Sequence, residues 1–160
     1  MKIVVEQANE IIKKQPFQSL AVMKSSLHWS SAGFYWIYTK KKFSHLKNAP
    51  KPSNSAHVNI SDLSKVHLNL PNVISQTGGN YWCIYNGKGK QLKTRIAAEY
   101  SDTKGPTGKL ALTRCFEEGD FKVKYVVCNT DSFRYSYDET KRDFERAWRL
   151  TVGWPILCRA

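Results

Sequence analysis

The chain has 160 residues, enough for one domain with a substantial core, and its 25 Lys and Arg against 13 Asp and Glu give a net charge of +12. This charge favours a polyanionic partner, nucleic acid before an acidic membrane surface. No window is long and apolar enough for a transmembrane helix, and the first residues lack the pattern of a signal peptide, so we expect a soluble cytoplasmic protein with no membrane partner.

The four cysteines are far apart in the sequence and form no CxxC pair or Cys/His cluster. Structural zinc sites usually take their ligands from close pairs, so this spacing argues against one. Cys83 and Cys128 lie in predicted buried strands, where a free cysteine behaves as a small apolar residue. The four histidines are scattered, and we expect surface or satisfied side chains rather than ligands or bases.

An amphipathic helix is predicted over residues 2–14, because apolar side chains recur there at helical spacing: Val4, Val5, Ala8, Ile11 and Ile12. Pro16 would end this helix, since proline has no backbone N–H to donate. We treat residues 1–32 as a helical extension of the domain. This extension completes the core, offers a dimer face, or acts as an arm that contacts DNA.

A short aromatic strand follows, from about Phe34 to Thr39. From residue 40 to residue 98 the chain then has ten Lys and Arg and only one acid, Asp62. So strong a bias favours contact with a DNA backbone over ordinary solvation. The candidate DNA-binding lysines are Lys40, Lys41, Lys42, Lys47, Lys51, Lys90 and Lys93.

Residues 43–80 connect this strand to the next one. The connection opens with a loop rich in Pro, Asn and Ser. Apolar residues then recur at helical spacing from Val58 to Leu70, with Asn59 or Ser61 as the N-cap. Pro71 stops this helix, and a glycine-containing turn leads back into the sheet.

The second strand covers residues 81–85, which are all strand formers. Asn86-Gly87 is a strong turn signal, and helical spacing of apolar residues begins shortly afterwards. We therefore expect a strand, a tight turn and a helix in succession. Tyr85 at the strand end and Arg95 on the helix would then face one pocket, and the basic residues between them suit a site for phosphate.

Further along we expect a polar loop over residues 101–108, a helix over 109–118 and a half-exposed strand over 121–127, where apolar residues alternate with lysines. The last helix is predicted from about Asp138 to Thr151. Glu145 lies beside the apolar face of that helix, so its carboxylate can line a cleft.

Two short motifs in the predicted strands, Gly33-Phe34-Tyr35 and Tyr85-Asn86-Gly87, resemble the paired signatures of the GIY-YIG nuclease superfamily. Arg95 follows Tyr85 by ten residues, as in the pattern of that family. Glu145 then precedes Pro155-Ile156-Leu157-Cys158, which is similar to the family's metal-binding glutamate and proline-led final segment. The resemblance spans most of the chain from Gly33 onward.

The resemblance implies an α/β (α+β) fold for a single domain of residues 1–160, with a small, mainly antiparallel central sheet flanked by helices. It also implies that residues 43–80 are an insertion between the first two core strands, which serves either sequence recognition or as a passive lid. The implied activity is that of a divalent-metal-dependent DNA endonuclease.

Hydrolysis of a phosphodiester needs a nucleophilic water, charge neutralisation on the phosphate and help for the leaving oxygen. By the resemblance, Glu145 binds one Mg²⁺ or Mn²⁺, and Arg95 holds a phosphate oxygen. Tyr35 or Tyr85 positions or deprotonates the water. A free tyrosine has a pKa of about 10, and Lys88 and Arg95 are expected to favour the phenolate.

The sequence departs from the family's pattern at three places. Asn86 replaces an apolar residue in the second signature, and Cys158 replaces the final asparagine. Glu99 stands where the family often has tyrosine or histidine, with Tyr100 next to it. Tyr100 therefore takes over that catalytic role or the role is absent, and Glu99 is a further candidate for the metal site.

Among proteins of this family, a chain this small most resembles a type II restriction enzyme. Its partner would be double-stranded DNA, and a homodimer is expected because one site cuts one strand. The alternatives are a phage or mobile-element nuclease, a repair-type structure-specific nuclease, and a non-catalytic basic nucleic-acid-binding module; RNA also remains open as a substrate. Glu145 would then be a surface residue, paired with Lys141 or Arg149 on its own helix.

Overall fold

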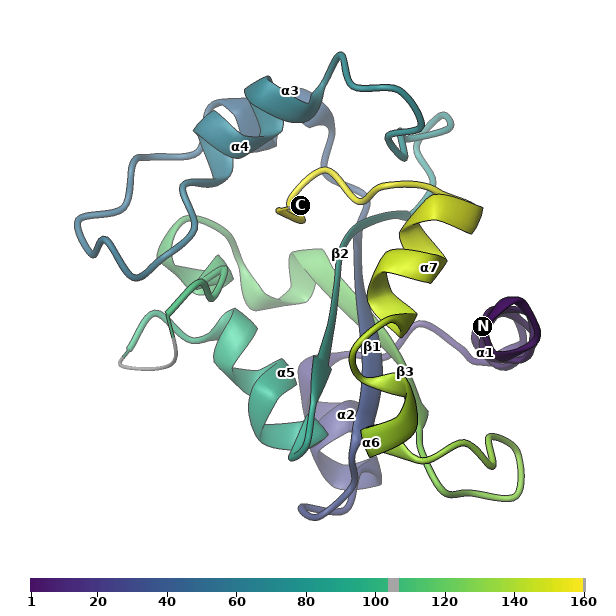
Figure 1. The fold of residues 1–160 in the computed structure, drawn as a ribbon. Coiled ribbons are helices and arrows are strands. Elements are labelled where there is room, and N and C mark those ends of the chain that lie inside the picture. The colour runs from purple at the N-terminus through teal and green to yellow at the C-terminus, as the bar shows by residue number, and fades with distance from the viewer. Residues whose placement is uncertain (104–106, 160) are drawn as a thin grey trace.

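The computed structural model describes residues 1–103 and 107–159. Over these ranges the protein is a mixed α/β fold built around a three-stranded antiparallel sheet of order β2-β1-β3 (Figure 1). The strands are β1 (Gly33–Thr39), β2 (Trp82–Gly89) and β3 (Phe121–Val127). The prediction of a small antiparallel sheet flanked by helices is confirmed.

Helices cover both faces of the sheet. Their bounds are α1 (Lys2–Lys14), α2 (Leu20–Ser26), α3 (Phe43–Lys47), α4 (Ile60–His67), α5 (Leu92–Tyr100), α6 (Tyr137–Thr140) and α7 (Phe144–Val152). In the described ranges no helix is long and apolar enough to cross a membrane. Helices α1 and α7 pack against one face of the sheet, and α2 and α5 pack against the other.

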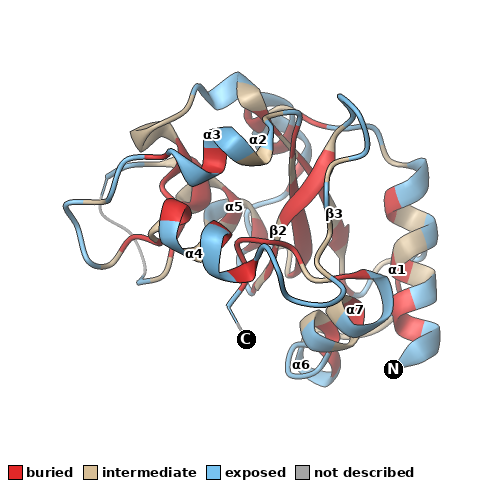
Figure 2. Cartoon of the chain, turned by 90° about the horizontal axis from the view of Figure 1, so that it is seen from above, coloured by how far each residue is buried: buried red, intermediate tan, exposed pale blue. Residues whose placement is uncertain are grey.

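The central strand β1 is buried on both faces. Phe34 and Trp36 lie in the core formed with α1 and α7, whereas Tyr35 and Ile37 lie in the core formed with α2 and α5. All four side chains are at most 1% exposed. Figure 2 shows the buried strands at the centre and the exposed outer faces of the helices around them. Because successive side chains of a strand point to opposite faces, one aromatic strand anchors two hydrophobic cores.

Helix α1 has the amphipathic character that the sequence predicts. Its buried residues are Val4, Val5, Ala8 and Ile12, and Ile3 on the opposite face is 69% exposed. The helix ends at Lys14, before Pro16. The N-terminal helix therefore completes the core on the α7 side of the sheet.

The connection from β1 to β2 carries α3 and α4. Asn59 is the N-cap of α4, and its side-chain oxygen accepts a hydrogen bond from the Asp62 amide at 3.1 Å. This helix is shorter at both ends than the predicted range of Val58 to Leu70. His67 is buried at its end, where Nδ1 lies 2.8 Å from the Ile156 carbonyl oxygen.

Both outer edges of the sheet are covered by other parts of the chain. On the β3 edge, Gln18 and Val123 exchange backbone hydrogen bonds of 3.1 and 2.8 Å, and the Gln15 side chain bonds to the backbone of Tyr125. On the β2 edge, the Leu157 amide donates to the Ile84 carbonyl at 2.9 Å. Backbone groups that an open edge strand would leave unpaired are thus satisfied at these positions.

The expected tight turn at Asn86-Gly87 is wrong, because β2 continues through these residues to Gly89. Asn86 pairs with Trp36 of β1, and Gly87 pairs with Tyr35. A side chain at Gly87 would collide with the Tyr35 ring, since its Cβ would lie 2.5 Å from Tyr35 Cζ. The glycine at position 87 therefore makes room for a tyrosine on the neighbouring strand.

Two predicted helices also differ. The expected helix over residues 109–118 is wrong, and the chain instead forms short 3-10 turns at Leu112–Arg114 and Glu118–Asp120. Leu110, Ala111 and Leu112 are all fully buried, and Ala111 has a left-handed backbone with φ of 50°. Three consecutive buried residues do not fit a helix with only one face against the core.

The predicted last helix, Asp138 to Thr151, is divided into α6 and α7. At the break, the Lys141 carbonyl accepts a hydrogen bond from Lys88 Nζ at 2.5 Å. A side chain of β2 thus takes a carbonyl that a continuous helix would use. The predicted loop over residues 101–108 includes residues 104–106, which lie outside the described residues.

We predict that Gly87→Ala lowers the free energy of unfolding by about 1–3 kcal/mol, because the new methyl group must displace the buried Tyr35 ring. Urea unfolding measures this change. Gly119→Ala is the matched control, since a Cβ there meets nothing within 4 Å, and we expect it to change stability by less than about 0.5 kcal/mol. Equal effects of the two variants would contradict the packing argument.

Candidate active site

A pocket of about 300 Å³ lies at β2, which α5 and α7 flank (Figure 1). Five of the six residues predicted to be catalytic line it: Tyr35, Tyr85, Lys88, Arg95 and Glu145. They come from β1, β2, α5 and α7. Residues far apart in the sequence thus meet in one concave site, and four of the five carry a positive charge or a phenol group.

Tyr35 and Tyr85 are neighbours on one face of the sheet, with ring centroids 6.1 Å apart. The Tyr35 hydroxyl is buried and has no hydrogen-bond partner among the described residues. Burial raises the pKa of Tyr35 well above its ordinary value, and the Glu99 carboxylate raises it further. Burial likewise raises the pKa of Tyr85, with a further contribution from Glu99.

The expected effect of Arg95 on the two phenols is present, but it does not produce a phenolate in the free protein. Arg95 lowers the pKa of both tyrosines, but burial has the larger effect. Both side chains are neutral phenols near neutral pH. A neutral phenol can donate or accept a hydrogen bond but carries no negative charge.

Glu145 is held at the pocket by cations from two elements. Lys88 Nζ on β2 lies 3.1 Å from Glu145 Oε2, and Arg149 Nη2 on α7 lies 4.0 Å from Oε1. The side chains of Lys88 and Glu145 are 35% and 20% exposed, so solvent reaches this pair. The pairing with Arg149 that helical spacing suggests is present, but the shorter contact crosses to β2.

Arg95 and Glu99 form an ion pair on α5, with Nη2 and Oε1 3.6 Å apart. Glu99 is completely buried, and within the described chain neither carboxylate oxygen has a hydrogen-bond partner. Burial raises the pKa of Glu99 to about 7, although Arg95 opposes this shift. Burial also disfavours the charge on Arg95, but Tyr35 and Glu99 outweigh it and raise the Arg95 pKa.

Tyr100, the sixth predicted catalytic residue, does not line the pocket. Its ring is 1% exposed and packs edge-on against Phe121, with centroids 6.3 Å apart. Glu99 also lies below the pocket surface, beside Arg95. Tyr100 therefore lies in the core, and Glu99 lies behind the pocket lining, where it contacts Arg95.

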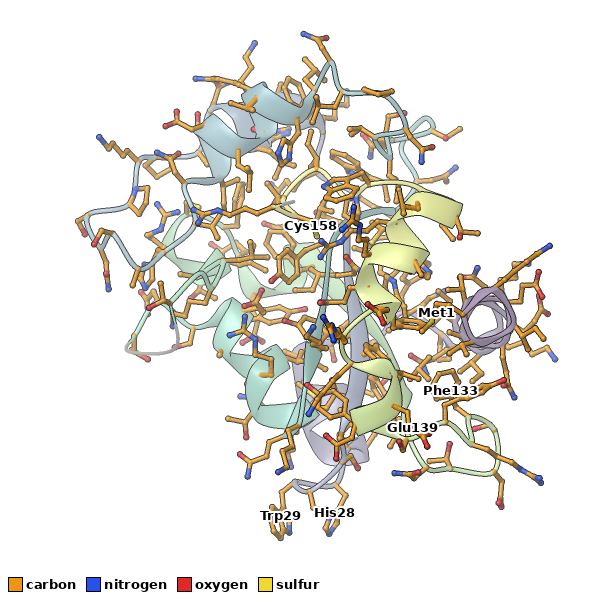
Figure 3. The ribbon with its side chains drawn as sticks, in the orientation of Figure 1. Met1, His28, Trp29, Phe133, Glu139 and Cys158 are labelled. Carbon is orange, nitrogen blue, oxygen red and sulfur yellow. The ribbon has the colours of Figure 1, made fainter. Side chains whose placement is uncertain are left out.

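Asn86 and Cys158, two of the departures from the GIY-YIG pattern, contact each other. The Asn86 amide donates to Cys158 Sγ at 3.3 Å, and Sγ donates back to Asn86 Oδ1 at 3.3 Å. Arg149 Nε donates to the same Oδ1 at 2.8 Å. Figure 3 shows Cys158 between the end of α7 and the sheet. The two residues that depart from the pattern thus hydrogen-bond to each other, and this contact anchors the C-terminal segment beside the pocket.

Sequence reasoning treated Arg149 only as a surface partner of Glu145. The structure places it in the pocket wall together with Arg159. The signal was present in the sequence, because Arg149 follows Glu145 by one helical turn and shares its face. No local pattern marked Arg159, which reaches the site through the fold of the last segment.

The candidate DNA-binding lysines do not form one surface. Lys40, Lys41 and Lys42 follow β1 at one end of the sheet, and Lys47 and Lys51 come next in the connection that carries α3 and α4. Lys90 and Lys93 lie at the opposite end, because Gly89 of β2 pairs with Gly33 at the start of β1.

Two of the lysines at the end of β1 already have partners. Lys41 pairs with Asp120 at 3.6 Å, and Lys40 Nζ lies 4.8 Å from the centre of the Tyr81 ring. The two groups of lysines therefore lie toward opposite ends of the sheet, and Lys40 and Lys41 are less available to a ligand.

The pocket offers few protein ligands for a divalent metal. Within residues 1–103 and 107–159 no group of three or more His, Cys, Asp or Glu residues is arranged to hold a metal ion. Glu145 is the one carboxylate in the described pocket lining. Mg²⁺ usually binds one or two carboxylates, phosphate oxygens and several waters, so Glu145 together with a bound phosphate fits this ion.

No protein-family model, curated protein or solved structure matches this chain in searches of all three. The function is therefore inferred from the geometry of the pocket and the order of the motifs.

We predict that Glu99→Gln stabilises the protein at pH 8 by up to about 3 kcal/mol relative to the original chain. A carboxyl whose pKa is raised to about 7 on folding contributes stability below its ordinary pKa of about 4.5, and loses it as pH rises through 7. Urea unfolding at pH 5 and pH 8 measures the difference.

Glutamine at position 99 cannot titrate, so the advantage of the variant should grow between these two pH values. Glu10→Gln on the exposed part of α1 is the control and should show no such growth. An advantage of Glu99→Gln that is equal at both pH values would contradict the raised pKa.

Proposed function

We propose that the protein is a divalent-metal-dependent endonuclease of the GIY-YIG type that hydrolyses phosphodiester bonds in DNA. One observation carries the proposal. Tyr35, Tyr85, Lys88, Arg95 and Glu145, which the resemblance selects from separate motifs, line a single pocket. Unrelated surface residues of a basic protein would have no reason to converge in this way.

The pocket supplies the groups that phosphodiester hydrolysis needs. Arg95 holds a nonbridging phosphate oxygen through its forked donors, and its raised pKa keeps it charged. Lys88 adds a second positive charge once a phosphate replaces Glu145 as its partner. Bound Mg²⁺ or Mn²⁺ would supply Lewis-acid stabilisation of the phosphate, with Glu145 as its protein ligand.

Tyr35 or Tyr85 orients the attacking water, because both side chains line the pocket. The Tyr35 hydroxyl is buried and has no hydrogen-bond partner in the described chain. Its raised pKa keeps its proton in place, so it acts by accepting a hydrogen bond from the water. The water oxygen then bonds to phosphorus as the ester P–O bond breaks. The water loses a proton to solvent or to the phosphate, and the leaving oxygen takes up a proton from solvent.

We further propose that the substrate is double-stranded DNA and that the enzyme is a type II restriction endonuclease acting as a homodimer. The lysines at both ends of the sheet offer contacts to a DNA backbone. The segment with α3 and α4 is long enough to recognise sequence. One pocket cuts one strand, so cutting of a duplex needs two copies.

Digestion of a large, defined, unmethylated DNA with and without Mg²⁺ tests this activity. We expect discrete, reproducible fragments that require the metal. A metal-dependent smear would retain the nuclease and refute the restriction enzyme. Salt-sensitive DNA binding without cutting under any divalent metal would instead identify a non-catalytic binding module.

Glu145→Gln should lower the cleavage rate at least about 100-fold, because it removes the proposed metal ligand. DNA binding by this variant should be retained or strengthened, since a negative charge leaves a pocket that also contains Lys88 and Arg149. Glu10→Gln removes an equal charge from exposed α1 and should keep full cleavage activity. Undiminished cleavage by Glu145→Gln would exclude the metal-ligand role.

A further inference from the structure

Trp29 is an unusually exposed aromatic residue. Its side chain lies in the turn between α2 and β1 and is 65% exposed. Figure 3 shows Trp29 and His28 projecting from one end of the molecule. Tryptophan has a large apolar surface and is enriched at interfaces with partners. An exposed tryptophan is therefore a candidate ligand-binding residue.

Trp29 forms one wall of a second pocket of about 650 Å³. Lys90, Gln91 and Asn129 supply polar groups to this pocket, and Tyr137 adds another aromatic ring. The combination of aromatic faces with a cation and amide groups matches the chemistry of a nucleotide, whose base stacks and whose phosphate is negative.

The Trp29 turn is fixed to its surroundings by backbone hydrogen bonds. The Ser31 carbonyl accepts from the Leu92 amide at 2.8 Å, and the Ala32 carbonyl accepts from the Cys128 amide at 2.9 Å. These bonds join the turn to the start of α5 and to the end of β3. The backbone that follows Trp29 is therefore fixed, which reduces the entropy that this segment loses when a ligand binds.

The second pocket adjoins the candidate active site. Lys88 lines the active-site pocket and Lys90 lines the Trp29 pocket, and two residues of extended chain span roughly 7 Å. Asp138 of the Trp29 pocket pairs with Lys141 at 2.6 Å, and the Lys141 carbonyl is bound by Lys88. One strand of nucleic acid can therefore reach both pockets with neighbouring nucleotides.

We propose that the Trp29 pocket binds a nucleobase of the DNA strand whose phosphate enters the active-site pocket. The base is unpaired, or flipped out of a duplex, and stacks on Trp29, while the phosphate next to it contacts Lys90. Asp138 disfavours a phosphate inside the pocket and leaves that space to the uncharged base. This inference rests on the proposed function, because it assumes that the substrate of the neighbouring pocket is a nucleic acid.

The test measures binding of two labelled single-stranded oligonucleotides of equal length, one with bases and one abasic throughout. All proteins carry Glu145→Gln, so that cleavage does not interfere. Trp29→Ala should weaken binding of the base-containing strand about 10- to 100-fold and leave binding of the abasic strand unchanged. Trp29→Phe should restore most of the affinity, since phenylalanine also stacks.

Two further variants separate stacking from charge and from general surface effects. Lys90→Ala should weaken both strands and reduce the slope of log Kd against log salt by about one, whereas Trp29→Ala should leave that slope unchanged. Leu150→Ala, at a residue that is also 65% exposed, should change neither affinity. Unchanged thermal unfolding of the Trp29 variants shows that the fold is intact.

Equal affinities of Trp29→Ala and the parent protein for the base-containing strand would overturn the proposal. So would an equal loss for both strands, or no binding of either strand by the parent protein. The proposed nuclease activity is judged separately by cleavage. If Trp29→Ala loses base-dependent binding but the original chain shows no metal-dependent cutting, the base pocket is supported and the nuclease is refuted. If the original chain cuts but Trp29→Ala binds the base-containing strand as well as its parent does, the nuclease is supported and the base pocket is refuted.

Discussion

The double burial of β1 is the constraint on which the rest of the structure depends. A strand covered on both faces must be apolar along its whole length, and Phe34, Tyr35, Trp36 and Ile37 meet this requirement with three aromatic rings. Only one of the four, Tyr35, has a polar group that faces the pocket. The position of Tyr35 is therefore set by the packing of the entire sheet. The glycine at position 87 on the neighbouring strand leaves the space that the Tyr35 ring occupies.

Burial also determines the electrostatics of the candidate site. The residues that would act on a phosphate are cations and neutral phenols above a buried carboxylate, Glu99. In the free protein the strongest contacts are internal, between Lys88 and Glu145 and between Arg95 and Glu99. A polyanion entering the pocket competes with these carboxylates for the same cations, so binding and reorganisation of the site are linked.

Local patterns were sufficient for some of the regular elements. A pattern within a few residues predicts the structure in three cases: the apolar stripe of α1, the Asn59 cap of α4 and the alternation along β3. Asn86-Gly87 misled because its turn propensity is local, whereas its pairing with β1 depends on a strand fifty residues earlier. The break between α6 and α7 has the same cause, since the Lys88 side chain that binds there belongs to β2. The motif order anticipated which residues share the pocket, but neither the burial of the two phenols nor the contact of Asn86 with Cys158 is visible in a linear pattern.

The covered edges of the sheet limit how two copies of this chain can associate. Gln15 and Gln18 occupy hydrogen-bonding positions along β3, and Leu157 does so along β2. A second subunit cannot add its own strand at these positions to build a continuous six-stranded sheet, because the ladder is already terminated on each side. A dimer that keeps these contacts therefore forms through other surfaces, such as the helices or the segment between β1 and β2. Association of that kind leaves each central sheet, and the pocket built on it, as an independent unit.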